Sequence, residues 1–116
     1  MEYLIYFDYK TVYLYKINHK NMTMQKYKFS YLMDLLNYIL DNEIKSVIFY
    51  SIGDLRLLYD NLMLNHVDCS VDNTIYKWRM ELPHSIRVCT TPLYYYELQG
   101  YKYAKHSKWY CDDNII

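Results

Sequence analysis

Apolar residues are gathered into short runs, separated by polar turns, along the first thirty residues. Two runs rich in β-branched and aromatic residues, Tyr3 to Phe7 and Thr11 to Ile17, are separated by Asp8-Tyr9-Lys10, and this pattern predicts a hairpin. Polar residues 18–21 predict a second turn, and Met22 to Phe29 has the period of two that suits a third strand. We therefore expect the chain to open with a three-stranded antiparallel meander.

A helical repeat follows the meander. Apolar residues recur at intervals of three and four, and Ser30 stands where an N-cap residue would begin a helix. The spacing predicts a helix that ends near Asp41 and Asn42. Its core-facing residues would be Leu32, Leu35, Leu36, Ile39 and Leu40.

The next two elements are a buried strand and a second helix. Ser46 to Tyr50 is a short apolar run without alternation, which is typical of a strand covered on both faces and central in its sheet. Ser51 and Asp54 follow at the spacing that satisfies free amide donors at a helix start. The apolar face of this second helix would consist of Leu55, Leu58, Tyr59, Leu62 and Met63.

The second half of the chain completes the expected fold. Thr74 to Leu82 and Ser85 to Thr90 are interpreted as two more strands. Tyr94 to Trp109 fits either a strand pair broken at Gly100 or a helix that ends there, followed by a tail. The elements predict one compact α+β domain over residues 1–116: the N-terminal meander, then helix, strand and helix, and two or more further strands in one mixed sheet with helices packed on it.

Composition bears on the origin of the chain more than on its chemistry. The 116 residues include 13 basic and 13 acidic side chains, so the net charge is zero and indicates no class of partner. Seventeen tyrosines beside one alanine and two glycines indicate an AT-rich genome, because tyrosine codons are AT-rich and those of alanine and glycine are GC-rich. Small tyrosine-rich chains of this kind are typical of viruses, phages and other mobile elements.

The expected location is the cytoplasm, that of the host cell if the protein is viral. No apolar run approaches the roughly 20 residues that cross a bilayer, so we expect no membrane contact. Glu2 and Asp8 stand where a secretory signal would carry Lys or Arg. Cys69, Cys89 and Cys111 are odd in number, which is consistent with reduced thiols in a cytosol-like compartment.

The order of the predicted elements resembles that of ribonuclease H-like domains over roughly the first 64 residues. That resemblance implies paired metal ions held by acids on the first strand and after the fourth, here Asp8 and Asp54. The competing interpretation, which we favour, is that Asp8 is a turn residue and Asp54 a helix-cap residue. His and Cys lack zinc-finger spacing, and Gly53 and Gly100 cannot form a phosphate loop. We expect no catalytic residue, no metal, no cofactor and no enzymatic activity.

Aromatic and basic residues interleave near the C-terminus, as in modules that stack single-stranded bases and neutralise phosphates. The residues concerned are Tyr101, Lys102, Tyr103, Lys105, Lys108 and Trp109. Residues 1–30 and 85–110 each carry a net charge of +3, whereas residues 31–84 carry −4. The charge segregation predicts a basic face opposite an acidic helical layer. The competing interpretation of the segment is a core strand enriched in tyrosine by codon bias.

The function predicted first is a small non-enzymatic interaction protein of the inhibitor or adaptor type, from a virus, phage or mobile element. Its partner would be a host or replication protein, with tyrosine and tryptophan as rigid anchors. The alternatives are a nucleic-acid-binding module and, third, a divergent ribonuclease H-like metal-dependent nuclease. A tyrosine-rich sheet with few Gly or Pro residues at its edges also predicts a homodimer.

Overall fold

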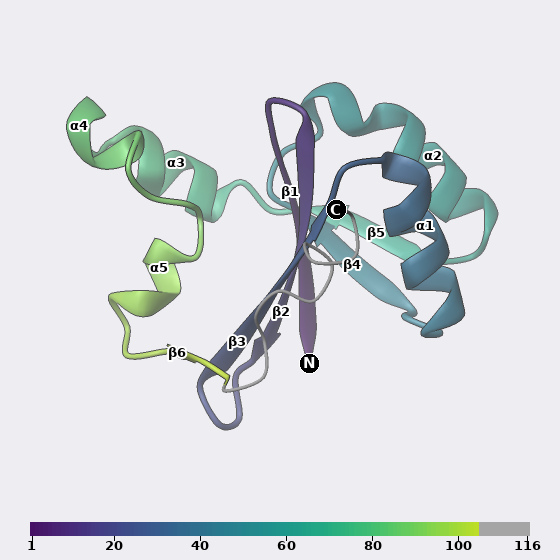
Figure 1. The fold of residues 1–116 in the computed structure, drawn as a ribbon, viewed down its shortest axis with the longest axis horizontal. Coiled ribbons are helices and arrows are strands. Elements are labelled where there is room, and N and C mark those ends of the chain that lie inside the picture. Colours follow the sequence, from purple (N-terminus) through teal and green to yellow (C-terminus); the bar gives the residue numbers. More distant parts are fainter. Residues whose placement is uncertain (105–116) are drawn as a thin grey trace.

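The computed structural model describes residues 1–104 and contains one six-stranded mixed sheet. The strands are β1 (Glu2–Asp8), β2 (Thr11–Asn18), β3 (Thr23–Phe29), β4 (Ser46–Phe49), β5 (Asp68–Val71) and β6 (Lys102–Tyr103). Their order across the sheet is β5-β4-β1-β2-β3-β6 (Figure 1). Strands β1, β2 and β3 form the predicted antiparallel meander, whereas the β1–β4, β4–β5 and β3–β6 pairs are parallel.

Helices cover both faces of this sheet. The longer ones are α1 (Leu32–Asp41) and α2 (Arg56–Leu64), which follows the short 3₁₀ helix η1 (Gly53–Leu55). The shorter ones are α3 (Thr74–Met80), α4 (His84–Arg87) and α5 (Tyr94–Glu97). Figure 1 shows α1 and α2 on one side of the sheet and α3 to α5 on the other. The predicted α+β class is thereby confirmed, and no described helix is long and apolar enough for a membrane span.

The meander keeps one register throughout. β1 pairs with β2 from Glu2↔Ile17 to Asp8↔Thr11, as the predicted hairpin requires. Within residues 1–104, four residues other than glycine have left-handed backbone in the turns and helix ends: Tyr9 (φ 56°), Met22 (φ 55°), Glu43 (φ 52°) and His66 (φ 63°). Side chains with a Cβ enter this region at a steric cost, so these positions are mildly strained.

The face under α1 and α2 carries a largely aliphatic core. Ile5 of β1, Leu14 of β2 and Phe49 of β4 are fully buried there. For β4, this agrees with the prediction of a strand covered on both faces. The predicted helix residues reach this core, with one exception: Met63 is 48% exposed. The buried helix residues are Leu35, Leu36, Ile39, Leu55, Leu58 and Leu62.

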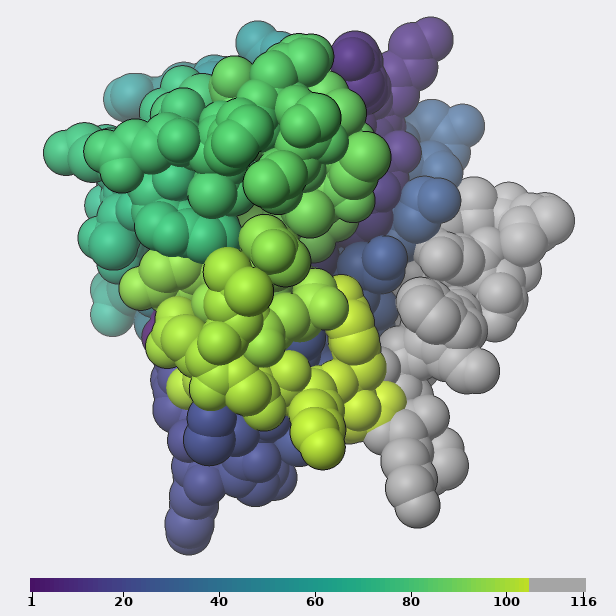
Figure 2. Space-filling view, turned by 90° about the vertical axis from the view of Figure 1, so that its left-hand side faces the viewer, coloured from purple at the N-terminus to yellow at the C-terminus, as the bar shows by residue number. Residues whose placement is uncertain are grey.

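The opposite face carries a core rich in tyrosine. Tyr6, Tyr15 and Tyr50 are buried from the sheet side, and Tyr96 is buried from α5. The rings of Tyr6 and Tyr50 meet edge to face, with their centroids 5.0 Å apart. Helices α3 to α5 form the outer layer over this core (Figure 2). Much of the tyrosine content is therefore structural.

Two predicted strands are wrong. Thr74 to Leu82 folds mainly as helix α3, and Ser85 to Thr90 overlaps helix α4 and the loop after it. The β-branched and aromatic residues of α3 favour a strand locally, but tertiary packing decides: spacing of four places Ile75 and Arg79 on the face buried against the sheet. Cys89, expected inside a strand, is exposed.

Two predicted caps are also absent, although the helices are present. Helix α1 begins after Tyr31 rather than Ser30, and neither α1, η1 nor α2 has a side-chain cap hydrogen bond. Of the two predictions for the tyrosine-rich segment, a helix ending before Gly100 is the one observed, as α5. The sheet instead gains β5, at a position that the periodicity did not indicate, and β6, a short strand after Gly100 within the segment for which a strand pair was the other prediction.

Candidate functional site

The residues predicted to bind nucleic acid divide between the described and undescribed parts of the chain. Lys105, Lys108 and Trp109 lie outside the described residues. Lys102 and Tyr103 form β6 beside the start of β3, and their side chains are exposed. Tyr101 is half-buried against the tyrosine-rich core. The structure therefore brings only Lys102 and Tyr103 together as an exposed pair.

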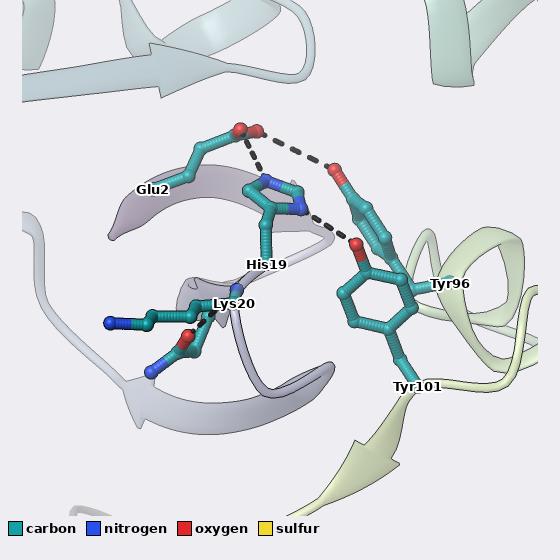
Figure 3. Close-up of polar contacts among 6 residues, drawn as sticks. Glu2, His19, Lys20, Tyr96 and Tyr101 are labelled. Atoms are coloured by element: carbon teal, nitrogen blue, oxygen red, sulfur yellow. Dashed lines mark hydrogen bonds and ion pairs between the residues drawn. The ribbon is translucent and has the colours of Figure 1, made fainter.

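Tyr101 is held by a hydrogen-bonded relay that connects three distant segments (Figure 3). Its hydroxyl lies 2.7 Å from Nδ1 of His19, and Nε2 of His19 lies 2.7 Å from Oε1 of Glu2. A carboxylate only accepts, so Nε2 donates to Glu2, and Nδ1 of a neutral ring accepts from Tyr101. The ring of Tyr101 also packs edge-on against Tyr96, with centroids 5.2 Å apart. This relay fastens the segment between α5 and β6 to the β2–β3 turn.

A cavity of about 300 Å³ opens beside this relay, and its charge is unfavourable for phosphate. Glu2 and Asp72 both line it, whereas none of the described residues lining it is Lys or Arg. Hydrogen bonding from Thr74 lowers the pKa of Asp72, so that carboxylate stays ionised at neutral pH. Burial, followed by the charge of Glu2, raises the pKa of Tyr96 and keeps its phenol neutral. Hydroxyl, imidazole and carboxylate have the order of an activated nucleophile, but the two carboxylates and the absence of Lys or Arg among the described lining residues disfavour an anionic substrate.

A second cavity, of about 250 Å³, lies at the carboxyl ends of the parallel strands β1 and β4. It is lined partly by Phe7 near the end of β1 and by the segment from Tyr50 to Asp54 after β4. Arg79 of α3 also lines it and is only 9% exposed. Burial alone would lower the pKa of Arg79, but hydrogen bonds to Tyr50 and Tyr6 outweigh burial and raise it. The guanidinium is therefore charged.

The acids implied by the ribonuclease H resemblance do not form a metal cluster in the described chain. Asp54 lines the cavity beside Arg79, whereas Asp8 is an exposed residue at the end of β1 and does not. Within residues 1–104, no group of three or more His, Cys, Asp and Glu side chains has the arrangement of a metal site. Two-metal hydrolysis needs several converging carboxylates.

We expect no nuclease activity. Labelled single- and double-stranded DNA and RNA, incubated with the protein in Mg²⁺ or Mn²⁺, should remain intact on a denaturing gel. The conservative variant Asp54→Asn provides the control. Cleavage by the wild type that this variant loses would contradict the prediction, because it would show that Asp54 takes part in metal-dependent chemistry.

An apolar groove separates the outer surfaces of α1 and α2. It encloses about 70 Å³ and is lined by Leu32, Met33, Leu36, Leu57, Leu58 and Asn61. Met33 is 61% exposed and Leu57 is 69% exposed, and Leu64, one heptad after Leu57, is 77% exposed. Met33, Leu57 and Leu64 lie outside the core-facing sets predicted for the two helices. An apolar residue on the predicted polar face was the sequence signal that could have revealed the groove.

Arg79 and the relay partners of Tyr101 had no such signal. Arg79 lies within a segment whose pattern predicts a strand, and Glu2 and His19 are 17 residues apart without a shared motif. The register of the meander brings Glu2 close to His19, and the position of α5 brings Tyr101 to both.

Comparisons with known proteins identify no relative. No family model matches the chain, and no curated protein or solved structure matches it either.

Proposed function

We propose that this protein is a non-enzymatic binding module whose α1–α2 groove receives a basic amphipathic helix of a partner protein. The observation that carries the proposal is the groove itself, an apolar surface on the helical layer that the described chain leaves exposed. Contiguous apolar surface rimmed by polar residues is characteristic of protein-binding sites.

The shape of the groove suits a helix. Leu57, Asn61 and Leu64 follow the i, i+4, i+7 stripe of α2, while Met33 and Leu36 border the groove from α1. A partner helix with apolar residues at the same spacing would lay its apolar face between the two stripes. Methionine is unbranched and adapts to the partner's side chains.

The charge around the groove selects a basic partner. Asp34 and Asp41 lie on α1, and the loop after α1 carries Glu43 and Lys45, whereas the one basic residue of α1 and α2, Arg56, is bonded to Asp60 at 3.2 Å. The two helices that border the groove are therefore net acidic. Lys and Arg beside the apolar stripe of the partner would complement them and accelerate association.

A peptide titration tests the proposal. The probe is a fluorescent amphipathic helix with leucines at i, i+3, i+4 and i+7 and lysines beside them, and its matched control has glutamates in place of the lysines. We expect anisotropy to show saturable binding of the basic peptide only. The double substitution Met33→Ser with Leu57→Ser should weaken binding at least about tenfold, which corresponds to about 1.4 kcal/mol.

Leu98→Ser is the surface control, because Leu98 is 60% exposed and caps α5 on the other side of the sheet. Absence of binding by the basic peptide, or equal loss in the Leu98 variant, would refute the groove as the site. Sedimentation of the same variants examines the predicted homodimer. Self-association abolished by the groove substitutions would assign the groove to a second copy of the chain instead.

A further inference from the structure

Arg79 is a buried positive charge surrounded by neutral acceptors. Its Nη1 donates to the hydroxyls of Tyr6 at 3.2 Å and Tyr50 at 3.4 Å. Its Nη2 donates to the backbone carbonyls of Arg87 at 3.1 Å and Thr90 at 2.6 Å. Its Nε is buried without a partner, and within residues 1–104 no carboxylate forms an ion pair with it. Burying a charge without a counter-charge is costly, so the site favours an anion.

Arg79 would attract such an anion through its charge, because its Nη hydrogens are already bonded, and the donors come from other residues of the cavity beside it. The hydroxyl of Tyr50 accepts from Arg79, which leaves its own hydrogen to donate. The hydroxyl of Ser51 also belongs to a lining residue. Both residues follow β4 at the carboxyl end of its parallel pair with β1, where open sheets commonly bind ligands.

Aromatic side chains form much of the remaining wall. Phe7 and Tyr76 line the cavity, and the ring of Tyr76 meets that of Tyr50 edge to face at 5.6 Å. Flat apolar walls suit a planar apolar group. The volume of about 250 Å³ lies just below the usual range of ligand pockets, which limits the ligand to a small molecule.

We propose that this cavity binds a small organic carboxylate that carries a planar apolar body. The carboxylate would face Arg79, Tyr50 and Ser51, and the planar body would lie between Phe7 and Tyr76. Asp54 also lines the cavity, and its charge disfavours a phosphate dianion relative to a carboxylate monoanion. This site lies apart from the α1–α2 groove, so it stands or falls independently of the proposed protein-binding function.

Four probe molecules distinguish the contributions of charge and shape. Phenylacetate is the expected ligand, phenylacetamide removes its charge, phenyl phosphate changes the anion and acetate removes the ring. Titrations followed by ¹H–¹⁵N NMR should show saturable shifts at the amides of Ser51 and Gly53 with phenylacetate below about 10 mM, and affinities for the other three probes at least about tenfold weaker.

Single substitutions then test the named groups. Tyr50→Phe and Ser51→Ala each remove one donor while keeping the cavity, and each should weaken phenylacetate binding by about fivefold to tenfold. Arg79→Lys keeps the charge without the guanidinium fork and should weaken it more. Lys102→Met, on the exposed edge strand β6, is the control and should bind as the wild type does. Thermal melting of each variant verifies that it is folded.

The proposal fails if phenylacetate shows no saturable shifts, or if phenylacetamide binds equally well. Equal affinity of the folded Tyr50→Phe and Ser51→Ala variants for phenylacetate would also overturn it. Tighter binding of phenyl phosphate than of phenylacetate would overturn the preference for a carboxylate.

Discussion

The free energy of unfolding is expected to fall steeply once the pH rises above about 10, the ordinary pKa of a phenol. Burial raises the pKa of Tyr15 well above that value, and burial together with the charge of Glu2 raises that of Tyr96. In the unfolded chain both phenols ionise near their ordinary pKa, whereas in the folded protein they remain neutral. The stabilisation is therefore complete below about pH 10 and is lost toward the raised pKa, at up to about 1.4 kcal/mol per pH unit for each phenol.

Urea unfolding at a series of pH values from about 8 to about 11.5 measures this loss, with tyrosinate absorbance recorded in parallel. Above about pH 10, Tyr15→Phe should make the fall of the unfolding free energy with pH less steep by up to about 1.4 kcal/mol per pH unit, which corresponds to one proton. Tyr9→Phe is the matched control, because the Tyr9 ring lies in the first turn and is 89% exposed. An unchanged slope in the Tyr15 variant would contradict the assignment of the loss to this buried phenol.

The largest effect of a single substitution is expected for Phe49→Ala, at about 3–5 kcal/mol of unfolding free energy. Phe49 is fully buried in β4, and its ring lies 5.5 Å from that of Tyr59, which packs from α2. Removing the ring loses its transfer free energy and leaves a cavity between the sheet and the helix. Chemical denaturation monitored by circular dichroism provides the measurement.

Leu98→Ala serves as its control, because Leu98 is 60% exposed and its truncation should change stability by no more than about 0.5 kcal/mol. Similar costs for the two variants would show that Phe49 is not a core residue of the folded protein.

Local periodicity was sufficient to predict the first half of the fold. In the meander and in α1, the residues that alternate or recur at three and four are those that a sheet or helix buries, so neighbouring positions carry the information. The same is true of β4, whose unbroken apolar run faces a helical layer on each side. Capping was a weaker guide, because α1 and α2 form without the side-chain bonds that Ser30 and Asp54 suggested.

The second half depends on contacts that no local pattern encodes. The residues of α3 favour a strand by propensity, and the helix is stabilised by Ile75 and Arg79 packing on a surface formed by Tyr6 and Tyr50, which are distant in sequence. The candidate sites also depend on contacts between residues that are distant in sequence. Arg79 faces a cavity bordered by the ends of β1 and β4, and Tyr101 is bonded to His19, 82 residues away in the sequence.

The left-handed turns record a cost of this unusual composition. The two glycines, Gly53 and Gly100, both have positive φ, and in the described part of the chain four further left-handed positions are occupied by Tyr9, Met22, Glu43 and His66. A glycine would enter this backbone region freely, whereas each of these side chains costs about 1–2 kcal/mol. Because the chain has few glycines, other side chains occupy these reversals and strain the backbone there. The strain is tolerated because the strands and helices on either side are well packed. The strain at these reversals therefore subtracts from the stability that the surrounding packing supplies.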